Sequence, residues 1–262
     1  MPEVTSHTPG SVSYFELMTP ILSWQQCIDF YGGLFGWDSE NDPILGFAQM
    51  KLGGKAVASI SISFDGPTFW LTHITVDDIS TVALQAVTAG GAVILAPTTL
   101  VSLLFGEWKQ AVIRDPAGAY FGLWQPGTRI GAQLVQDPGT LLWSDLRTSN
   151  IDPAKTYYGT VFGWGVHAYE IAGEGLITEW RLNGLNNRGG TTQFNPAWPT
   201  DSQPHWLPYF SVADTDATAQ KAVALGGQVK VPPANTWIGR TAVLADPAGG
   251  NFRVAAIREP AG

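Results

Sequence analysis

Apolar and polar residues follow two different spacings along the chain, which predict strands and helices in turn. SVSYFELMT (11–19) is typical of a strand, and Pro20 interrupts it. In SWQQCIDFYGGLFG (23–36) the apolar residues recur every three or four positions, which predicts a helix capped by Ser23. The other elements expected up to residue 124 are strands at 44–50, 56–63, 69–76, 92–95, 110–114 and 119–124 and a helix at 79–89.

The same pattern occurs twice. FYGGLFGW (30–37) returns as YYGTVFGW (157–164), and RDPAGAYFGLW (114–124) returns as ADPAGGNFRVA (245–255), an offset of about 130 residues. A period of this length indicates a duplicated domain. In the second copy we expect strands at 139–148, 176–183, 189–193 and 205–212, helices at 153–162 and 215–225, and a polar loop at 194–204. We predict one domain at 11–126, a linker at 127–139 and a second domain at 140–258.

Composition and charge exclude several classes of function. The 262 residues are 45% hydrophobic, enough for a core in each copy, and the net charge of −8 argues against nucleic acid or an anionic membrane as partner. Cys27 is the single cysteine, so no disulfide and no Cys/His zinc spacing can form. The sequence has no signal-peptide pattern and no apolar run of membrane-spanning length, so we expect a cytoplasmic protein. It also lacks a phosphate-binding loop and a nucleophile elbow.

Several motifs in this order resemble the vicinal oxygen chelate superfamily, which includes glyoxalase I, bleomycin-resistance proteins and extradiol dioxygenases. The carriers are FYGGLFGW and YYGTVFGW, the two DPAG turns, YFEL and LWSDL in the first strands, HWLPYF, and GRTAVLADPAG. The motifs are most similar to a two-domain, glyoxalase-like branch associated with polyketide and other antibiotic pathways. The resemblance implies an α+β fold of two tandem domains, each made of paired βαβββ modules whose sheet curls around a cleft.

The resemblance also locates the positions that hold a divalent metal in catalytic members of the superfamily. Here these positions carry Tyr14, Ser59, Leu71 and Gly122 in the first copy and Trp143, Gly190, Leu207 and Arg253 in the second. None of these residues is His, Asp, Glu or Cys, so we expect no metal and no cofactor.

Strand alternation indicates which other side chains share the face of those positions. Glu16, His73, Asp145 and Tyr209 lie two residues along from them, and Tyr120 and Trp124 flank Gly122. The predicted cleft residues are Tyr14, Glu16, His73, Tyr120 and Trp124 in the first copy and Trp143, Asp145, Tyr209 and Arg253 in the second. Aromatic rings with a few polar groups suit a flat, partly polar organic ligand.

The two copies differ before the DPAG turn. The second copy has the polar PPANTWIGR, whereas the first has PTTLVSLLFGEW (97–108), an apolar run where we expect a loop. Three interpretations stay open: a lid over a ligand, which would add Phe105 and Trp108 to the binding residues, a contact with another domain or subunit, or an ordinary extended strand. We expect a monomer by default, and a homodimer stays open.

Two functions fit these residues. The favoured one is a metal-free protein that binds a bulky aromatic, polyketide-like or antibiotic-like ligand, in self-resistance or as a biosynthetic accessory. The alternative is a metal- and cofactor-independent tailoring enzyme of cyclase, isomerase, lyase or hydroxylase type. In that enzyme Glu16 or Asp145 would be the general acid or base, with His73 or Tyr209 as the second proton-transfer group. A purely structural role for Glu16, Asp145 and His73 is the competing interpretation.

Overall fold

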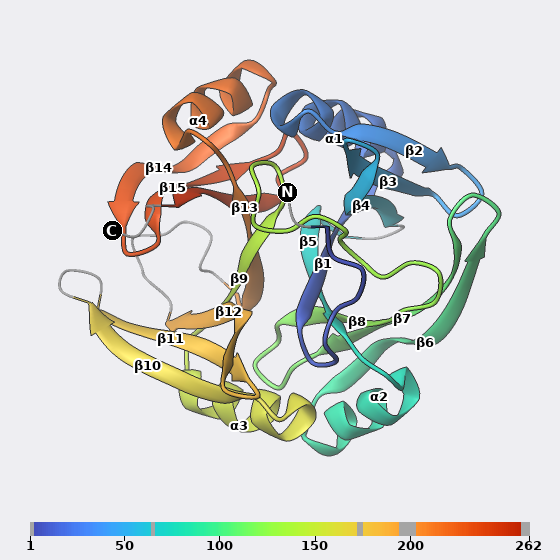
Figure 1. Ribbon diagram of the computed structural model, residues 1–262, viewed down its shortest axis with the longest axis vertical. Helices are drawn as coiled ribbons and strands as arrows, with labels where there is room; N and C mark the ends of the chain where they lie inside the picture. The colour runs from blue at the N-terminus through green and yellow to red at the C-terminus, as the bar shows by residue number, and fades with distance from the viewer. Residues whose placement is uncertain (1–2, 64–65, 172–174, 194–202, 258–262) are drawn as a thin grey trace.

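The computed structural model describes residues 3–63, 66–171, 175–193 and 203–257. Within them the chain forms two curled eight-stranded sheets and four helices, one half following the other along the sequence (Figure 1). The predicted α+β fold with two tandem halves is confirmed. The loop predicted at 194–204 falls largely outside the described residues, and the predicted domain limits stay predictions.

The first half contains β1 to β8 and two helices. Its sheet has the strand order β2-β3-β4-β1-β5-β8-β7-β6, in which β1 and β5 lie at the centre. Its elements are β1 (Val12–Pro20), α1 (Ile21–Phe35), β2 (Asp38–Asp42), β3 (Phe47–Leu52), β4 (Lys55–Ser63), β5 (Phe69–Thr75), α2 (Ile79–Thr88), β6 (Ala92–Ser102), β7 (Gly106–Arg114) and β8 (Tyr120–Gln125).

The second half repeats this topology in the order β10-β11-β12-β9-β13-β16-β15-β14. Its elements are β9 (Leu141–Thr148), α3 (Ile151–Phe162), β10 (Gly165–Ile171), β11 (Gly175–Leu182), β12 (Leu185–Gln193), β13 (His205–Ser211), α4 (Thr215–Ala224), β14 (Gln228–Thr236), β15 (Gly239–Ala245) and β16 (Asn251–Ile257).

Three details of the first half differ from the prediction. The helix α1 begins directly after Pro20, whose side chain makes no capping hydrogen bond. Ser23 therefore lies inside the helix and is not its N-cap. The strand β2 has the polar sequence DSEND at the edge of the sheet and was not predicted, and neither was its counterpart β10. The apolar segment 97–108 is no loop, because it forms the end of the β6–β7 hairpin with Leu103 at the tip, 99% exposed.

The repeated helix-end motif explains how α1 and α3 stop. Gly36 and Gly163 follow these helices in the left-handed conformation, with φ of 74° and 70°, which glycine adopts without strain. The tryptophan that follows each glycine packs into the core and reaches across to the other half. Trp37 Nε1 donates to Gly139 O at 2.8 Å, just before β9, and Trp164 Nε1 donates to Gly10 O at 2.7 Å, just before β1.

The two halves are joined by reciprocal contacts. Figure 1 places α1 beside α4 and α2 beside α3, and the central strands β5 and β13 also meet. The hydroxyl of Tyr31 in α1 donates to Asp246 Oδ2 at 2.9 Å, in the DPAG turn of the second half. In return, Tyr158 in α3 donates to Asp115 Oδ2 at 3.0 Å, in the turn of the first half. The repeated motifs therefore hold the interface between the halves.

The segment between the halves runs back along the first half. Ala132 N donates to Ser13 O at 3.0 Å, and Gln133 N donates to Ala56 O at 2.7 Å. The buried His7 ring is fixed to the same segment, because its Nε2 lies 2.7 Å from Ala132 O. These bonds hold residues 128–133 against the first-half sheet.

Acid is expected to weaken this attachment through His7. Burial lowers its pKa to about 4, and Nδ1 has no protein partner among the described residues, so a proton there would be unpaired. Because the folded pKa lies below the unfolded one, the contribution of neutral His7 is complete above pH 6.5 and is lost as the pH falls towards 4. We expect up to about 3 kcal/mol of pH-dependent unfolding free energy in this window, seen in urea titrations at each pH. The variant His7→Gln should have a flatter profile, and an unchanged profile would contradict the assignment.

Candidate functional site

Two central strands place the first group of candidate residues on one face of the first-half sheet. In the β1–β5 pairing Tyr14 lies opposite His73, and Glu16 lies two pairs further along, on the same face as Tyr14. Gly122 of β8 is the partner of His73 on the other side. These residues and Trp124 are all buried, so this concave face is a packed interior and not an open surface.

A carboxylate and an imidazole form a buried pair on this face. His73 Nε2 donates to Glu16 Oε2 at 2.8 Å, and Ser61 Oγ donates to Glu16 Oε1. Burial raises the pKa of Glu16, but the hydrogen bonds from His73 and Ser61 outweigh it and leave that pKa below its usual range. Glu16 is 2% exposed and His73 is fully buried. At neutral pH Glu16 is therefore an ionised carboxylate whose two oxygens both have protein donors.

An arginine that the sequence analysis did not select lies beside this pair. The guanidinium carbon of Arg129 is 4.2 Å from the ring centroid of Trp108, 4.4 Å from Phe47 and 5.0 Å from Trp124. Phe105 and Tyr14 complete the surrounding rings at 5.7 and 5.8 Å. Arg129 Nη2 donates to the Tyr14 hydroxyl at 3.2 Å. The result is an aromatic cage around a cation of the protein itself.

The residues at the superfamily's metal positions do not fit a metal ion. A Cβ on Gly122 would lie 2.1 Å from His73 Nδ1, so the imidazole fills the space of a longer side chain on the last strand. In the second half a Cβ on Gly190 would lie 2.7 Å from the Trp143 ring. No cluster of three or more His, Cys, Asp or Glu side chains suited to a metal occurs in the described part of the chain. At both places a ring of the protein, His73 or Trp143, occupies the space next to the glycine.

The concave face of the second half is also occupied by internal contacts. Asp145 accepts from Arg147 Nη1 at 3.1 Å and from Thr192 Oγ1 at 3.0 Å. Arg253 Nη1 donates to the Tyr209 hydroxyl at 3.0 Å, and burial raises the pKa of Tyr209 to about 12. Both carboxylates that the sequence singled out, Glu16 and Asp145, therefore have protein partners.

A tryptophan from a hairpin covers the second-half face. Trp237 follows β14, and its ring centroid lies 5.9 Å from that of Trp143 and 6.2 Å from that of Tyr169 in β10. The hairpin thus reaches from one edge of the curled sheet to the other.

The remaining predicted residues divide into two groups. Phe105 in the turn of the β6–β7 hairpin and Trp108 near the start of β7 are both buried on the first-half face. Tyr120 is 39% exposed, and its nearest aromatic neighbour is Phe69, so the structure does not bring it to the buried rings. Sequence reasoning missed Arg129, Phe47, Ser61, Arg147 and Trp237. Alternation along β3 and β4 points to Phe47 and Ser61, but no pattern selects Arg129 in a turn-rich linker.

A pocket of about 370 Å³ opens beside the caged arginine. Leu104 and Phe105 come from the β6–β7 hairpin, and the segment Thr128–Gly131 forms another wall. Glu40, Gln49, Lys51, Ala56, Gln133 and residues 3–5 complete the rim together with Gly54. The pocket adjoins the first-half face at Phe105 and Arg129.

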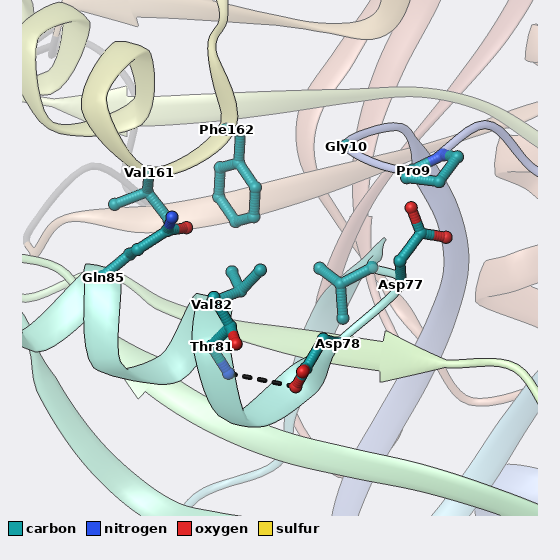
Figure 2. Close-up of a pocket in the computed structure, with 10 residues that line it drawn as sticks. Pro9, Gly10, Asp77, Asp78, Thr81, Val82, Gln85, Val161 and Phe162 are labelled. Carbon is teal, nitrogen blue, oxygen red and sulfur yellow. Dashed lines mark hydrogen bonds between the residues drawn. The ribbon is translucent and has the colours of Figure 1, made fainter.

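A second pocket, of about 310 Å³, lies in the seam between α2 and α3 (Figure 2). Figure 2 shows Val82 and Phe162 on facing sides of it. The Asp78 carboxylate accepts from Thr81 N at 3.1 Å, so it caps α2. None of the lining side chains is a buried polar group without a partner among the described residues. We interpret this pocket as a packing gap at the interface between the halves and not as a binding or catalytic site.

Comparison with known proteins agrees with this architecture. A family model described as the glyoxalase/bleomycin resistance protein/dioxygenase superfamily matches residues 140–254. The chain is 35% identical to CFP32 of Mycobacterium tuberculosis (strain CDC 1551 / Oshkosh), which carries glyoxylase in its name, over 97% of each chain. It is 32% identical to the anthracycline biosynthesis protein DnrV of Streptomyces peucetius, over 98% of this chain and 96% of that one.

Solved structures share the fold at low identity. The Mn(II)-bound glyoxalase from Novosphingobium aromaticivorans superposes with a TM-score of 0.66 and 15% identity, over 96% of this chain and 83% of that one. The duplicated modules and curled sheets define a protein of the vicinal oxygen chelate type. The chain belongs to the glyoxalase/bleomycin resistance protein/dioxygenase superfamily. No helix among the described residues combines the length and apolar character needed to span a membrane.

Proposed function

We propose that the protein binds a bulky aromatic, polyketide-like small molecule without a metal, in self-resistance or as an accessory of biosynthesis. The observation that carries the proposal is that rings of the protein occupy the space at two of the superfamily's metal positions, while Glu16 and Asp145 are committed to internal hydrogen bonds. Neither of these two carboxylates is therefore free to act as a general acid or base. The anthracycline biosynthesis relatives DnrV and DauV support a ligand of this class.

The pocket that adjoins the first-half face is the best candidate for the binding place. Its volume of about 370 Å³ is within the range of roughly 300–1,000 Å³ usual for small-molecule sites. Phe105 offers a ring for stacking, and Leu104 extends the apolar wall. Most of segment 97–108 is extended strand, as the third interpretation has it, and we propose that the turn of this hairpin, which walls the pocket, is in addition a lid over the ligand.

Removing the stacking ring is expected to weaken binding. We propose titrating a hydroxyanthraquinone into wild-type protein and Phe105→Ala by isothermal calorimetry. Loss of ring contact should reduce affinity by about 1–3 kcal/mol, or roughly 5- to 150-fold. The matched control is Trp143→Ala, which removes a ring of similar burial from the second-half face. Equal weakening by both variants, or none by Phe105→Ala, would count against this pocket.

A second candidate function rests on the Glu16–His73 pair. A carboxylate that orients an imidazole is a recurring element of acid–base catalysis, and the Tyr14 ring lies nearby. This supports a metal-independent lyase, isomerase or cyclase. The geometry favours binding, since Nε2 of His73 is used by Glu16 and Nδ1 faces Gly122. Liquid chromatography coupled to mass spectrometry of the ligand after incubation separates the two: binding predicts an unchanged retention time and mass, and catalysis predicts a new peak, of the same or a different mass, that is absent with Glu16→Gln.

A further inference from the structure

The cation in the aromatic cage has incompletely used hydrogen-bonding capacity. Arg129 is 7% exposed, and its Nη2 donates to Tyr14. Its Nε and Nη1 are buried and have no protein acceptor among the described residues. The surrounding rings stabilise the flat face of the guanidinium, but its N–H groups need oxygen atoms in the plane of the group. Burying such donors without acceptors is unfavourable.

The nearby carboxylates do not satisfy this cation. The charge of Glu16 stabilises the charged form of Arg129, but Glu16 accepts its hydrogen bonds from His73 and Ser61. On the rim, Glu40 is paired with Lys51, and Glu3 is paired with Lys55 at 2.6 Å. Arg129 is therefore the one charged residue lining the pocket that has no ion-pair partner in the described part of the chain.

The arginine is also held rigidly at the pocket wall. Thr128 N donates to Glu107 O at 3.0 Å and Ala132 N donates to Ser13 O, so backbone bonds fix the chain on both sides. Trp124 Nε1 donates to Arg129 O at 3.2 Å. A cation already fixed in place loses little conformational freedom when an anion binds, which favours affinity.

We propose that this pocket binds an organic carboxylate, with the ligand's ring system on Phe105 and its carboxylate on the free N–H groups of Arg129. This rests on the proposed function and specifies its ligand as an aromatic acid. Arginine pairs with carboxylate through charge-assisted hydrogen bonds, which are about twice as strong as neutral ones. The charges of the rim residues are matched within the ion pairs Glu40–Lys51 and Glu3–Lys55, so Arg129 is the group that selects for the ligand's charge.

The test compares two probes that differ only in charge. Anthraquinone-2-carboxylate and anthraquinone-2-carboxamide are titrated into the wild-type protein by calorimetry. We expect the acid to bind about 10- to 100-fold more tightly, the range for a hydrogen bond to a charged group. The preference should fall at high salt. It should disappear in Arg129→Gln and stay within twofold in Lys51→Gln, whose cation already has a partner.

The outcomes separate this inference from the proposed function. Equal binding of acid and amide by the wild type overturns the carboxylate site and leaves aromatic binding intact. A preference that survives in folded Arg129→Gln also overturns it. Failure of both probes to bind overturns both proposals. If Arg129→Gln does not fold, the wild-type comparison and its salt dependence still decide the question.

Discussion

Replacement of Asp246 by alanine is expected to lower the free energy of unfolding by about 3–5 kcal/mol. The carboxylate is buried between the halves, where Oδ2 accepts from Tyr31 and Oδ1 accepts from Ala248 N and Gly250 N, both at 2.9 Å. Alanine leaves three donors without an acceptor, two buried and one part-buried, and a buried one costs about 1–3 kcal/mol before rearrangement. Urea unfolding followed by fluorescence measures the change.

Two further variants make this prediction specific. Asp115→Ala should cause a loss of similar size, because Tyr158 and the amides of Gly118 and Ala119 bind its carboxylate in the same way. Tyr31→Phe removes only one of the donors to Asp246 and should cost about 1 kcal/mol. If Asp246→Ala costs no more than Tyr31→Phe, the turn is not the anchor that the contacts indicate.

The second large effect is expected at Gly122. Its α-carbon lies against the His73 ring, and an alanine Cβ would come within 2.1 Å of Nδ1. The ring cannot turn away without breaking its bond to Glu16, so Gly122→Ala should cost about 3 kcal/mol in urea unfolding. Any longer side chain meets the same obstacle.

Gly163→Ala is the matched control for this substitution. Gly163 has open space around its Cβ position and a φ of 70°, so alanine there costs only backbone strain of about 1 kcal/mol. Combining Gly122→Ala with His73→Ala should be less damaging than the sum of the two, because the small side chain makes room for the methyl group. If the losses of unfolding free energy are additive, the clash with the imidazole of His73 is not the cause of the effect at Gly122.

Local patterns in the sequence predicted most of the fold because the duplication repeats the glycine ends of α1 and α3 and the DPAG turns. These patterns failed where a strand is formed only through pairing with the adjacent strand. The polar segment DSEND of β2 has no alternation of apolar residues. It forms a strand because its residues Asp38 to Asp42 pair with the backbone of β3. The β6–β7 hairpin end was expected to be a loop because the matching segment of the second copy is polar. In the structure its apolar residues point to opposite sides, with Leu103 exposed and Phe105 buried.

The candidate site could be predicted only in part from the sequence. Alternation correctly groups Tyr14, Glu16 and His73 on one face, since the period of a strand fixes it. It does not reveal that Glu16 and His73 pair with each other, because strand register depends on the folded sheet. Arg129 was missed because the linker has no periodicity, and its position depends on bonds to Ser13 and Glu107, more than a hundred and about twenty residues away respectively.

The reciprocal Tyr31–Asp246 and Tyr158–Asp115 contacts are interchanged when the two halves are exchanged, which is the property of an isologous interface. A half-length polypeptide with one such tyrosine and one such turn would satisfy both contacts only by associating with a second copy. Joining the copies in one chain turns that association into an intramolecular event. The interface then no longer depends on protein concentration, and each half is free to change its own concave face.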